Sequence, residues 1–362
     1  MVYTCHWGLV GAGEISELFL LDLIAVPATR GVTDVAHKPV AVAARSLDRA
    51  KTFIATHVPD LKDSIKAYGS YAEIVADSTI DVIYVGTTQS THYEVALLAL
   101  RAGKNVLCEK PFTINSKQAE HLALVAKEKN VFLMEAVWTR FFPLTIEFEK
   151  LIHKDMVIGP IRRVFTDFSV YCPADPGFRL YNLEAGGGAL LDLGLYALMW
   201  MFLTCYKHPE NHRSNPDVVK AVSLKSPLSV DESTAITTLW SKPKILCVST
   251  CSLMMDSPSE CVVRVQGDKG DVIIPIHGSR PEKIIINVTG EESKTLDFPI
   301  PGQGLFWEAD AVARDIRDGK KVDDRYPIKD SVLSMQIMDD VRRQNDFKFP
   351  DALEFVEDYT SA

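Results

Sequence analysis

Two short stretches, far apart in the chain, contain residue types that can move a proton. In the first, Glu109-Lys110-Pro111, an acid, a base and a proline follow an apolar, strand-like run. In the second, Asp192 and Tyr196 are four residues apart on a helix-like run and share one face of it. A free tyrosine, with a pKa of about 10, is a weak base at neutral pH, but a nearby lysine cation favours the phenolate. These groups together suit general acid–base chemistry.

Each stretch also has an ordinary structural explanation. Glu109 and Lys110 could form a solvated ion pair at a strand end, which would contribute little to stability. Asp192 and Tyr196 could share a hydrogen bond in a core, because buried polar groups need partners. The surrounding chain favours the chemical explanation in both cases.

The first strand-to-helix turn carries a glycine motif that is typical of dinucleotide binding. A strand-like run at residues 7–10 leads into Gly11-Ala12-Gly13-Glu14-Ile15-Ser16 and then into a helical pattern. Gly11 allows a tight turn, and Gly13 lets the backbone approach a pyrophosphate that the helix N–H groups can hold. Ser16 stands where a third glycine or alanine is common. We therefore expect the cofactor to contact Gly11, Gly13, Glu14 and Ile15.

The end of the second predicted strand indicates which cofactor binds. Residues 40–44 are followed by Arg45-Ser46-Leu47-Asp48-Arg49. Folds that prefer NAD place an acid at this strand end to bind the ribose hydroxyls. Arg45, Ser46 and Arg49 instead offer two cations and a hydroxyl, which suit the 2′-phosphate of NADP. A solvent-facing helix start would also explain them, but NADP is the favoured interpretation.

Strand and helix patterns continue to alternate, which predicts right-handed βαβ units and a parallel sheet. The predicted strands are residues 80–85, 105–108 and 131–134, and the predicted helices are about 93–102 and 116–129. Because ligands bind beyond the carboxyl ends of such strands, Thr87, Thr88 and His92 are candidates to line the cofactor, as are Glu109 and Lys110. A hydrogen-bonding role at a helix start explains His92 equally well.

After about residue 140 the pattern changes to alternating apolar and polar residues. A helix at 143–154 is followed by strand-like runs at 161–171, 218–224, 234–240, 245–253, 261–265, 271–274 and 283–288. These runs predict a mostly antiparallel, single-layer sheet, whose second face must be covered by helices or by another subunit. We predict two domains: residues 1–139 bind the cofactor, and residues 140–362 bind the substrate and form a dimer.

The composition excludes several other classes of protein. A hydrophobic content of 47% and a charged content of 24% are those of an ordinary soluble protein. The net charge of −9 argues against a broad nucleic-acid-binding surface. Seven cysteines without CxxC pairs, and a start that does not resemble a signal peptide, favour a cytoplasmic location. The longest apolar stretch, near 196–205, is too short to span a bilayer, so we expect a buried helix and no membrane association.

Taken in order, these motifs resemble the glucose–fructose oxidoreductase / inositol dehydrogenase family. The resemblance rests on Gly11-x-Gly13, Ala44-Arg45-Ser46, Glu109-Lys110-Pro111, Met134-Glu135-Ala136-Val137-Trp138-Thr139-Arg140 and the run from Gly186 to Tyr196. It spans almost the whole chain. The Glu-Ala-Val-Trp-Thr-Arg run and a tyrosine at 196, where many relatives carry histidine, are most similar to the dimeric dihydrodiol dehydrogenase / NADP-dependent D-xylose 1-dehydrogenase group. Thr88 and Ser16 depart from the family pattern.

The resemblance implies an N-terminal Rossmann domain with a doubly wound parallel sheet. A C-terminal domain with a large open-faced, mostly antiparallel sheet follows, and homodimers form through that sheet. The implied activity is the oxidation of a sugar hemiacetal or a vicinal diol with hydride transfer to NADP. Tyr196 is assigned as the general base, Lys110 as its electrostatic partner and Asp192 as an orienting acid. The reverse assignment of Lys110 and Tyr196 stays open.

Further side chains are candidates for the substrate pocket, because aromatic rings stack on sugar or diol rings and arginines bind hydroxyls. They are Trp138, Arg140, Phe168, Arg179 and Trp307. His208 and His212 have a metal-like spacing, but the loop around them supplies no further obvious ligand, so we expect no metal. The nicotinamide would carry the redox chemistry.

Two alternatives remain at this stage. The same groups would serve an NADPH-dependent reductase of a sugar ketone or dicarbonyl. A protein of another class, a non-catalytic regulator that senses the cofactor on the same scaffold, could keep the glycines and lose Lys110 or Tyr196. Both of these residues are present, which favours an enzyme.

Overall fold

A computed structural model of the protein describes residues 2–357, which fold as two compact units. Of the described residues, unit 1 comprises 2–141, 300–332 and 355–357, and unit 2 comprises 142–299 and 333–354. The first crossing between the units therefore lies close to the boundary that the sequence suggested. The chain then returns to unit 1 at residue 300. The sequence suggested a single boundary at 139/140 and did not predict this return.

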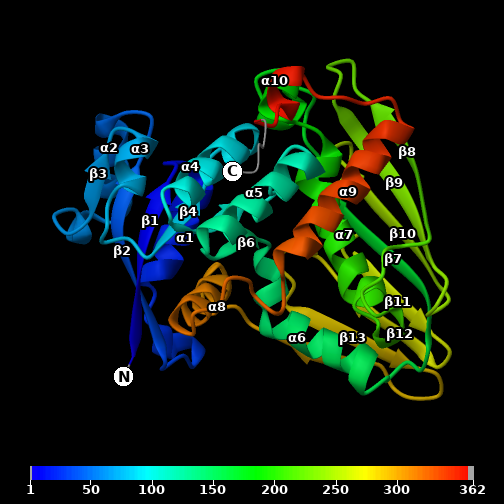
Figure 1. The fold of residues 1–362 in the computed structure, drawn as a ribbon. Helices are drawn as coiled ribbons and strands as arrows, with labels where there is room; N and C mark the ends of the chain where they lie inside the picture. The colour runs from blue at the N-terminus through cyan, green and yellow to red at the C-terminus, as the bar shows by residue number, and fades with distance from the viewer. Residues whose placement is uncertain (1, 358–362) are drawn as a thin grey trace. The chain divides into compact units, whose positions relative to one another are not determined.

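Unit 1 is built on a six-stranded parallel sheet in the order β3-β2-β1-β4-β5-β6 (Figure 1). The strands are β1 (Tyr3–Val10), β2 (Val35–Ala43), β3 (Lys66–Tyr68), β4 (Val82–Val85), β5 (Asn105–Glu109) and β6 (Leu133–Ala136). The strand order reverses between β1 and β4, as in doubly wound dinucleotide-binding folds, whose ligands bind at that reversal. The predicted Rossmann fold is confirmed.

The early helices of unit 1 connect these strands. They are α1 (Glu14–Ile24), α2 (Leu47–His57), α3 (Tyr71–Val75), α4 (His92–Arg101) and α5 (Ser116–Lys129). Helix α5 has the bounds that the sequence predicts, because both ends carry local signals. Asn115 accepts a hydrogen bond from the backbone of Gln118 at the start, and Asn130 adopts a left-handed conformation at the end.

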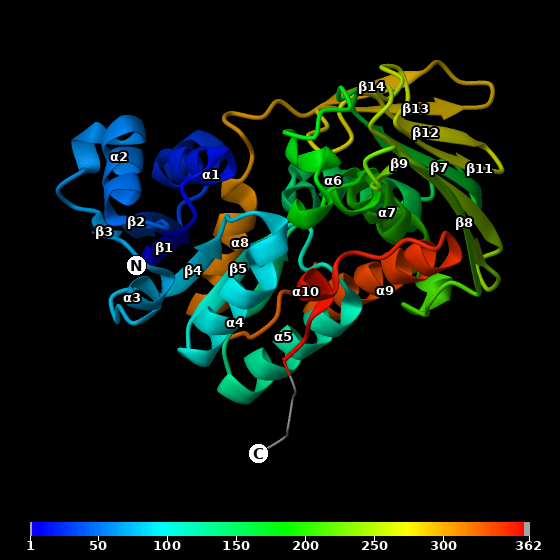
Figure 2. The ribbon, with the colours of Figure 1, turned by 90° about the horizontal axis from the view of Figure 1, so that it is seen from above.

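Helix α8 (Phe306–Arg317) belongs to unit 1 although it comes late in the chain. It packs against α1, β1 and β2, and Figure 2 shows it among the early elements. The carboxylate of Asp22 accepts a hydrogen bond from the backbone N–H of Leu305 at 2.8 Å, next to the start of α8. Arg30 binds Asp310 of α8 through a fully buried ion pair of 2.7 Å. These contacts explain why residues 300–332 leave the second domain.

Unit 2 is built on an eight-stranded sheet in the order β14-β13-β12-β11-β7-β10-β9-β8. The strands are β7 (Ile161–Ser169), β8 (Val218–Lys225), β9 (Asp231–Trp240), β10 (Ile245–Ser252), β11 (Val263–Gly267), β12 (Gly270–Ile274), β13 (Lys283–Val288) and β14 (Lys294–Asp297). All seven predicted runs are strands. The sheet is antiparallel except where β7 pairs with β10, and this parallel pair and the short, exposed β14 were not predicted.

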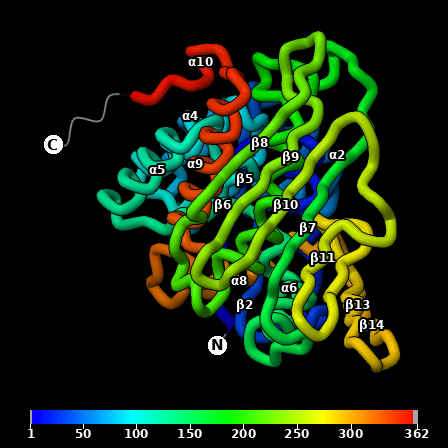
Figure 3. The backbone as a smooth tube through the Cα atoms, turned by 90° about the vertical axis from the view of Figure 1, so that its right-hand side faces the viewer, coloured from blue at the N-terminus to red at the C-terminus, as the bar shows by residue number. Residues whose placement is uncertain are grey.

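Helices lie along one face of this sheet only. Helix α6 (Pro143–Glu149) packs on β13, α7 (Leu195–Met201) packs on β7 and β10, and the end of α9 (Ile328–Gln344) bonds to β8. Figure 3 looks onto the opposite face, where no described helix of unit 2 covers the strands. The predicted open-faced sheet is confirmed.

The helical run that contains α7 is longer than the sequence suggested. It extends from Leu183 to Tyr206 and is long and apolar enough, by length and composition, to cross a membrane. The most apolar window of this run is completely buried inside the protein. The prediction of a buried helix is therefore supported, but the argument from its short length was wrong. The run is widened by π-helical turns at Leu190–Gly194 and Phe202–Tyr206.

Candidate active site

The glycine loop between β1 and α1 has the geometry that its sequence predicts. Gly11 adopts a φ of 112°, and a Cβ there would collide with the carbonyl oxygen of Gly86. A Cβ on Gly13 would meet nothing within 4 Å, so the loop is open at the start of α1. Glu14 and Ile15 form the first turn of α1, whose N–H groups point toward this opening. The loop thus fits the pyrophosphate of a dinucleotide.

Ser16 occupies the position of the third small residue without filling the loop. Its side chain is fully buried, and its hydroxyl donates to the carbonyl oxygen of Gly86 at 3.3 Å. A side chain on Gly86 would collide with this hydroxyl. The serine therefore ties α1 to the end of β4, and the departure from the family pattern is accommodated locally.

The residues predicted to bind the 2′-phosphate follow β2. Arg45 is exposed, and the Ser46 hydroxyl accepts a hydrogen bond from the backbone N–H of Arg49, which caps α2. The Arg49 guanidinium donates to the carbonyl oxygen of Ala12 in the glycine loop at 3.4 Å. One of the two cations therefore contacts the loop that would hold the pyrophosphate, and the binding of the 2′-phosphate by Arg45, Ser46 and Arg49 stays a prediction.

His92 joins two loops at the carboxyl edge of the parallel sheet. Its Nδ1 lies 2.8 Å from the carbonyl oxygen of Pro111, and its Nε2 lies 3.1 Å from that of Thr87. The side chain is buried at the first position of α4. Because both ring nitrogens contact backbone carbonyls, the structure favours the hydrogen-bonding role for His92. Thr88 remains exposed in the same loop.

The buried carboxylate of Glu109 binds the backbone of Lys110. One carboxylate oxygen accepts a hydrogen bond of 2.8 Å from the Tyr84 hydroxyl, and the other accepts one of 3.2 Å from the backbone N–H of Lys110. Burial raises the pKa of Glu109 to about 7, against the opposing effects of Tyr84 and Lys110. The sequence predicted Glu109 as a cofactor contact, and the structure gives it internal partners.

A second buried acid in unit 1 was not predicted. Glu308 of α8 is fully buried, and neither of its carboxylate oxygens has a hydrogen-bond partner among the described residues. Burial, followed by the charges of Glu109 and Asp22, raises the pKa of Glu308 well above its usual range. The two glutamates therefore carry less than two full charges at neutral pH. The sequence of α8 gives no local signal that Glu308 is buried beside Glu109.

The end of β6 and the run after it form a buried cluster with Tyr326. Glu135 accepts hydrogen bonds from the backbone N–H of Phe112 at 2.9 Å and from the Tyr326 hydroxyl at 2.6 Å. The Arg140 guanidinium lies over the Tyr326 ring, 4.1 Å from its centroid, and the arginine is only 2% exposed. Arg140 thus takes part in a core cluster, and its contact with a substrate stays a prediction.

Two more candidates for the pocket wall belong to unit 1. Trp138 is half-buried at the start of the short helix Trp138–Phe141. Trp307 is also half-buried and packs edge-to-face on Phe306, with ring centroids 4.9 Å apart. Both rings retain exposed surface, and their role toward a substrate stays a prediction.

Asp192 and Arg179, which the sequence suggested for separate roles, form a two-point ion pair in unit 2. The guanidinium nitrogens lie 3.1 and 3.3 Å from the two carboxylate oxygens. The Asp192 side chain is buried, whereas the Arg179 side chain is 52% exposed. The acid therefore holds a guanidinium that can still reach a ligand from solvent.

Tyr196 lies in the first turn of α7, close in sequence to Asp192. Its ring is 6% exposed and packs against Phe168 of β7, with ring centroids 4.8 Å apart. The structure of unit 2 thus holds Tyr196 and Phe168 together, and separately pairs Asp192 with Arg179. Lys110 belongs to unit 1, so its approach to Tyr196 stays a prediction.

Asp231 fixes the start of the helix that carries Asp192 and Tyr196, and it was missed. Its carboxylate accepts a hydrogen bond of 2.6 Å from the backbone N–H of Leu190. Gly188 has a φ of 128°, and a Cβ there would collide with the same carboxylate. Burial raises the pKa of Asp231 to about 6, opposed by its hydrogen bonds. The glycine run predicted a close approach of the backbone, and Asp231 is the partner.

The described residues contain no group of three or more His, Cys, Asp or Glu side chains that could hold a metal. His208, one of the two histidines with metal-like spacing, accepts a hydrogen bond from the backbone N–H of Glu210 at 3.2 Å. This contact gives His208 a local structural role.

Comparison with known families agrees with the fold of unit 1. Residues 5–137 match the Gfo/Idh/MocA family model, described as an oxidoreductase family with an NAD-binding Rossmann fold. The matched segment runs from β1 to the end of β6, and it includes the glycine loop and Lys110.

Comparison with characterised proteins extends the similarity over both units. D-xylose 1-dehydrogenase (NADP(+)) of Hypocrea jecorina is 39% identical over 97% of this chain and 94% of that protein. Trans-1,2-dihydrobenzene-1,2-diol dehydrogenase of Danio rerio is 36% identical over 94% of this chain and 96% of that protein. The similarity therefore includes the segments that carry Asp192 and Tyr196.

Solved structures share the complete fold. The 3-ketoreductase KijD10 of Actinomadura kijaniata, in complex with NADP and TDP-benzene, has a TM-score of 0.77 at 23% identity over 94% of this chain and 98% of that chain. Aldose–aldose oxidoreductase of Caulobacter crescentus has a TM-score of 0.76 at 23% identity over 94% of this chain and 97% of that chain. At this identity the comparison establishes the fold alone.

Proposed function

Because this chain belongs to the glucose–fructose oxidoreductase / inositol dehydrogenase (Gfo/Idh/MocA) family, we propose that it is an NADP-dependent dehydrogenase of sugars or diols. The substrate class is an aldose in its hemiacetal form, D-xylose foremost, or a vicinal trans-dihydrodiol. The names of the two relatives that are 39% and 36% identical over nearly the whole chain support this class.

The observation that carries the proposal is the arrangement around the helix of Tyr196. A phenol packs on an aromatic ring, and one turn earlier an acid holds a half-exposed arginine. Such an arginine can bind the hydroxyls of a sugar or diol, while the tyrosine in its phenolate form can accept a proton. The open glycine loop and the arginines after β2 supply the matching cofactor features in unit 1.

Oxidation of the substrate requires the loss of a hydroxyl proton and of a hydride from the same carbon. Bound NADP supplies the hydride acceptor. We assign Tyr196 as the base that takes the proton, and Lys110 as the cation that favours its phenolate form. Asp192 orients Arg179 through the two-point ion pair. Glu109 holds the backbone of Lys110 through its N–H.

An initial-rate panel tests the proposal. NADP and NAD, each with D-xylose, other pentoses, hexoses and a trans-dihydrodiol, are followed by absorbance at 340 nm. We expect turnover with at least one aldose or diol, and a higher kcat/KM with NADP than with NAD. The same panel run backwards, with NADPH and sugar ketones or dicarbonyls, measures the reductase direction. The absence of turnover in both directions, with NADP still bound, would instead favour a cofactor-sensing regulator.

The uncovered face of the eight-stranded sheet supports a homodimer. Large apolar side chains on this face stay exposed, among them Val222 at 72% and Leu224 at 59%. Exposed apolar surface of this kind marks an interface, and a sheet face can bury it against its own copy. We expect sedimentation velocity to show a dimer, and Val222→Glu combined with Leu224→Glu to shift it to monomer.

A further inference from the structure

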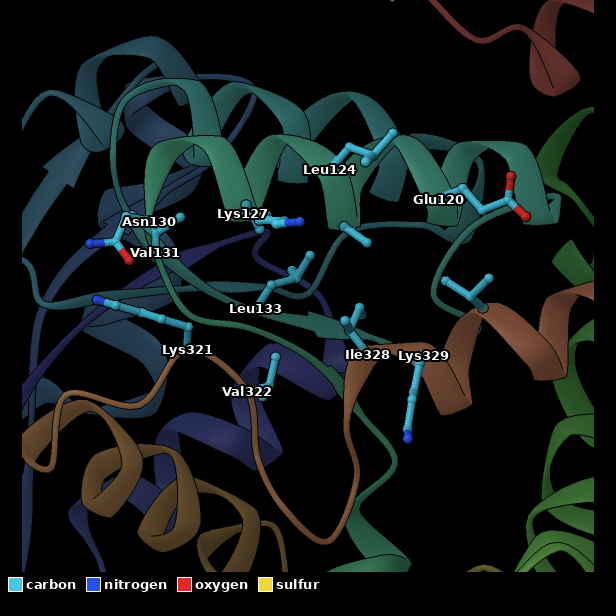
Figure 4. Close-up of a pocket in the computed structure, with 13 residues that line it drawn as sticks. Glu120, Leu124, Lys127, Asn130, Val131, Leu133, Lys321, Val322, Ile328 and Lys329 are labelled. Carbon is cyan, nitrogen blue, oxygen red and sulfur yellow. The ribbon is translucent and has the colours of Figure 1, made fainter. Parts of the chain in front are cut away.

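A cavity of about 620 Å³ lies in unit 1, between α5 and the segment 321–332, which includes the first turn of α9 (Figure 4). None of the residues assigned to the cofactor, the substrate or catalysis lines it. Its volume is within the range of small-molecule sites, roughly 300–1,000 Å³. We call this cavity the α5 groove.

The long wall of the α5 groove is one face of α5. Glu120, Leu124 and Lys127 follow each other at helical spacing on this wall, and Asn130 ends it. Ten residues of helix span about 15 Å. The groove is therefore elongated, with room for a chain or a fused ring system.

The floor of the groove is apolar and lies along the last strand of the parallel sheet. Val131 and Leu133 of β6 form it from one side, and Ile328 and Val332 of α9 close it from the other. The backbone N–H of Leu133 is bonded to the carbonyl oxygen of Lys321 at 3.3 Å. A peptide strand cannot add to this edge at that position, so an occupant is held by side chains.

The mouth of the groove exposes apolar surface to solvent. Leu124 is 46% exposed, and Val322, on the opposite wall, is 42% exposed. Figure 4 shows the two side chains on facing elements of the groove. Burial of this surface against an apolar group would favour the binding of that group.

The charge around the groove is positive, although the protein as a whole carries a net charge of −9. Lys127, Lys321 and Lys329 line it, against one acid, Glu120. None of the three lysine ammonium groups forms an ion pair with a residue in the described part of the chain. Lysines that line an apolar floor favour an anion that also has an apolar body.

We propose that the α5 groove binds a small amphipathic anion, an apolar chain or ring system that carries one carboxylate, sulfonate or phosphate head. The apolar body lies along Leu124, Leu133 and Ile328, and the head lies at Lys127 and Lys321. This site is separate in its residues from the dehydrogenase site, so its test does not depend on turnover.

Calorimetric titration of the full chain, saturated with NADP to fill the cofactor site, tests the proposal. The probes are octanoate, which has both an apolar chain and a carboxylate, 1-octanol, which has the apolar chain without the charge, and acetate, which has the carboxylate without the chain. We expect octanoate to bind at one site per chain, 1-octanol to bind about tenfold more weakly, and acetate to show no binding at this site. Equal affinity of octanoate and 1-octanol, or no binding of octanoate, would overturn the proposal.

A matched pair of double variants locates the site. Lys127→Glu with Lys321→Glu reverses the charge in the groove and should weaken octanoate binding at least tenfold. Lys117→Glu with Lys129→Glu makes the same change in charge on α5 at two exposed positions that do not line the groove, and should leave binding unchanged. Equal loss in both variants, or no loss in the first, would refute the assignment.

The remaining occupant to distinguish is a second copy of the chain. Val322→Asp introduces a charge at the mouth of the groove and should weaken octanoate binding without a change in sedimentation. If this substitution instead dissociates a dimer, and octanoate does not bind the original protein, the groove is a subunit interface and the proposal fails. Unchanged NADP affinity and melting temperature show that the variants are folded.

Discussion

The two units support their predicted catalytic residues with carboxylates of opposite character. In unit 1, Glu109 precedes Lys110 in the chain and is buried, and its carboxylate accepts hydrogen bonds from a phenol and from the backbone N–H of Lys110. In unit 2, Asp192 lies one turn before Tyr196 and is paired with the guanidinium of Arg179. The first carboxyl gains a proton near neutral pH, and the second is held beside a permanent cation.

This difference indicates that the two carboxylates have different roles. A carboxyl that titrates near neutrality can change the local charge beside Lys110 with pH, whereas an arginine keeps its charge throughout. We therefore expect the pH dependence of the enzyme to originate in unit 1. We expect the geometry of substrate binding to depend on the ion pair in unit 2. The variants below test this comparison in order of decreasing effect on activity.

Lys110→Met tests the motif that Glu109 supports. Loss of the cation removes the effect that favours the phenolate, so we expect kcat to fall about 1,000-fold. The affinity for NADP, measured by fluorescence titration, should change much less. Lys117→Met, a change at an exposed lysine of α5, is the matched control and should have normal kinetics. Full turnover by the Lys110 variant would show that Lys110 is not catalytic, and Glu109 would then have no catalytic residue to support.

Arg179→Leu tests the ion pair of unit 2. It leaves the buried carboxylate of Asp192 without its guanidinium, so the orientation of the substrate is lost, and we expect kcat/KM to fall about a hundredfold. Arg179→Lys keeps the charge but not the two-point geometry, so its kcat/KM should lie between that of the original protein and that of Arg179→Leu. Kinetics unchanged in both variants would show that the pair is only a structural contact.

Glu109→Gln should flatten the pH profile of kcat. With its pKa raised to about 7, this carboxyl is mostly protonated at pH 6 and mostly ionised at pH 8, so the charge beside Lys110 changes between them. The glutamine variant lacks this change, and we expect its ratio of kcat at pH 8 to kcat at pH 6 to differ several-fold from that of the original protein. A profile of unchanged shape would place the titrating group elsewhere.

The same variant has a predicted effect on stability. The folded protein binds a proton at Glu109 more tightly than the unfolded chain does, so this group destabilises the fold as pH rises from about 4.5 to about 7. Glu109→Gln should therefore raise the melting temperature relative to the original protein at pH 8 more than at pH 5. Differential scanning calorimetry at both pH values measures this difference, and the opposite sign would contradict it.

Asp231→Leu should have the smallest effect on activity. It removes the acceptor for the Leu190 N–H at the start of the helical run that carries Tyr196, and loss of such a cap costs about 1 kcal/mol. In a chain of this size that corresponds to a melting temperature lower by about 3 °C. Asp231→Asn keeps a carbonyl acceptor and should recover most of the loss. If the asparagine and leucine variants have the same melting temperature, the cap does not contribute as proposed.

The sequence predicted elements well where the signals are local. The turn at Gly11 and Gly13, and both ends of α5, follow from residues within a few positions of the feature. The lengths and alternation of β7 to β13 were likewise visible in the chain. These features depend on backbone preferences and on the period of apolar residues, which neighbouring residues determine.

The missed features all join residues that are distant in sequence. Asp231 approaches Gly188 from the start of β9, Glu308 comes to Glu109 from a late helix, and Tyr326 reaches Glu135 from a loop. The parallel pairing of β7 with β10 is also non-local. No periodicity specifies which buried acid meets which partner, because that depends on how complete elements pack.

The return of residues 300–332 to unit 1 has a consequence for how the protein is made. A nascent chain that has left the ribosome up to residue 141 carries every strand of the parallel sheet, but it lacks α8 and the loop of Tyr326. Asp22 and the faces of β1 and β2 that pack on α8 then lack these partners, and Glu135 has the backbone N–H of Phe112 but not the Tyr326 hydroxyl. The nucleotide-binding half therefore begins first and is completed only after almost all of the other half has been translated.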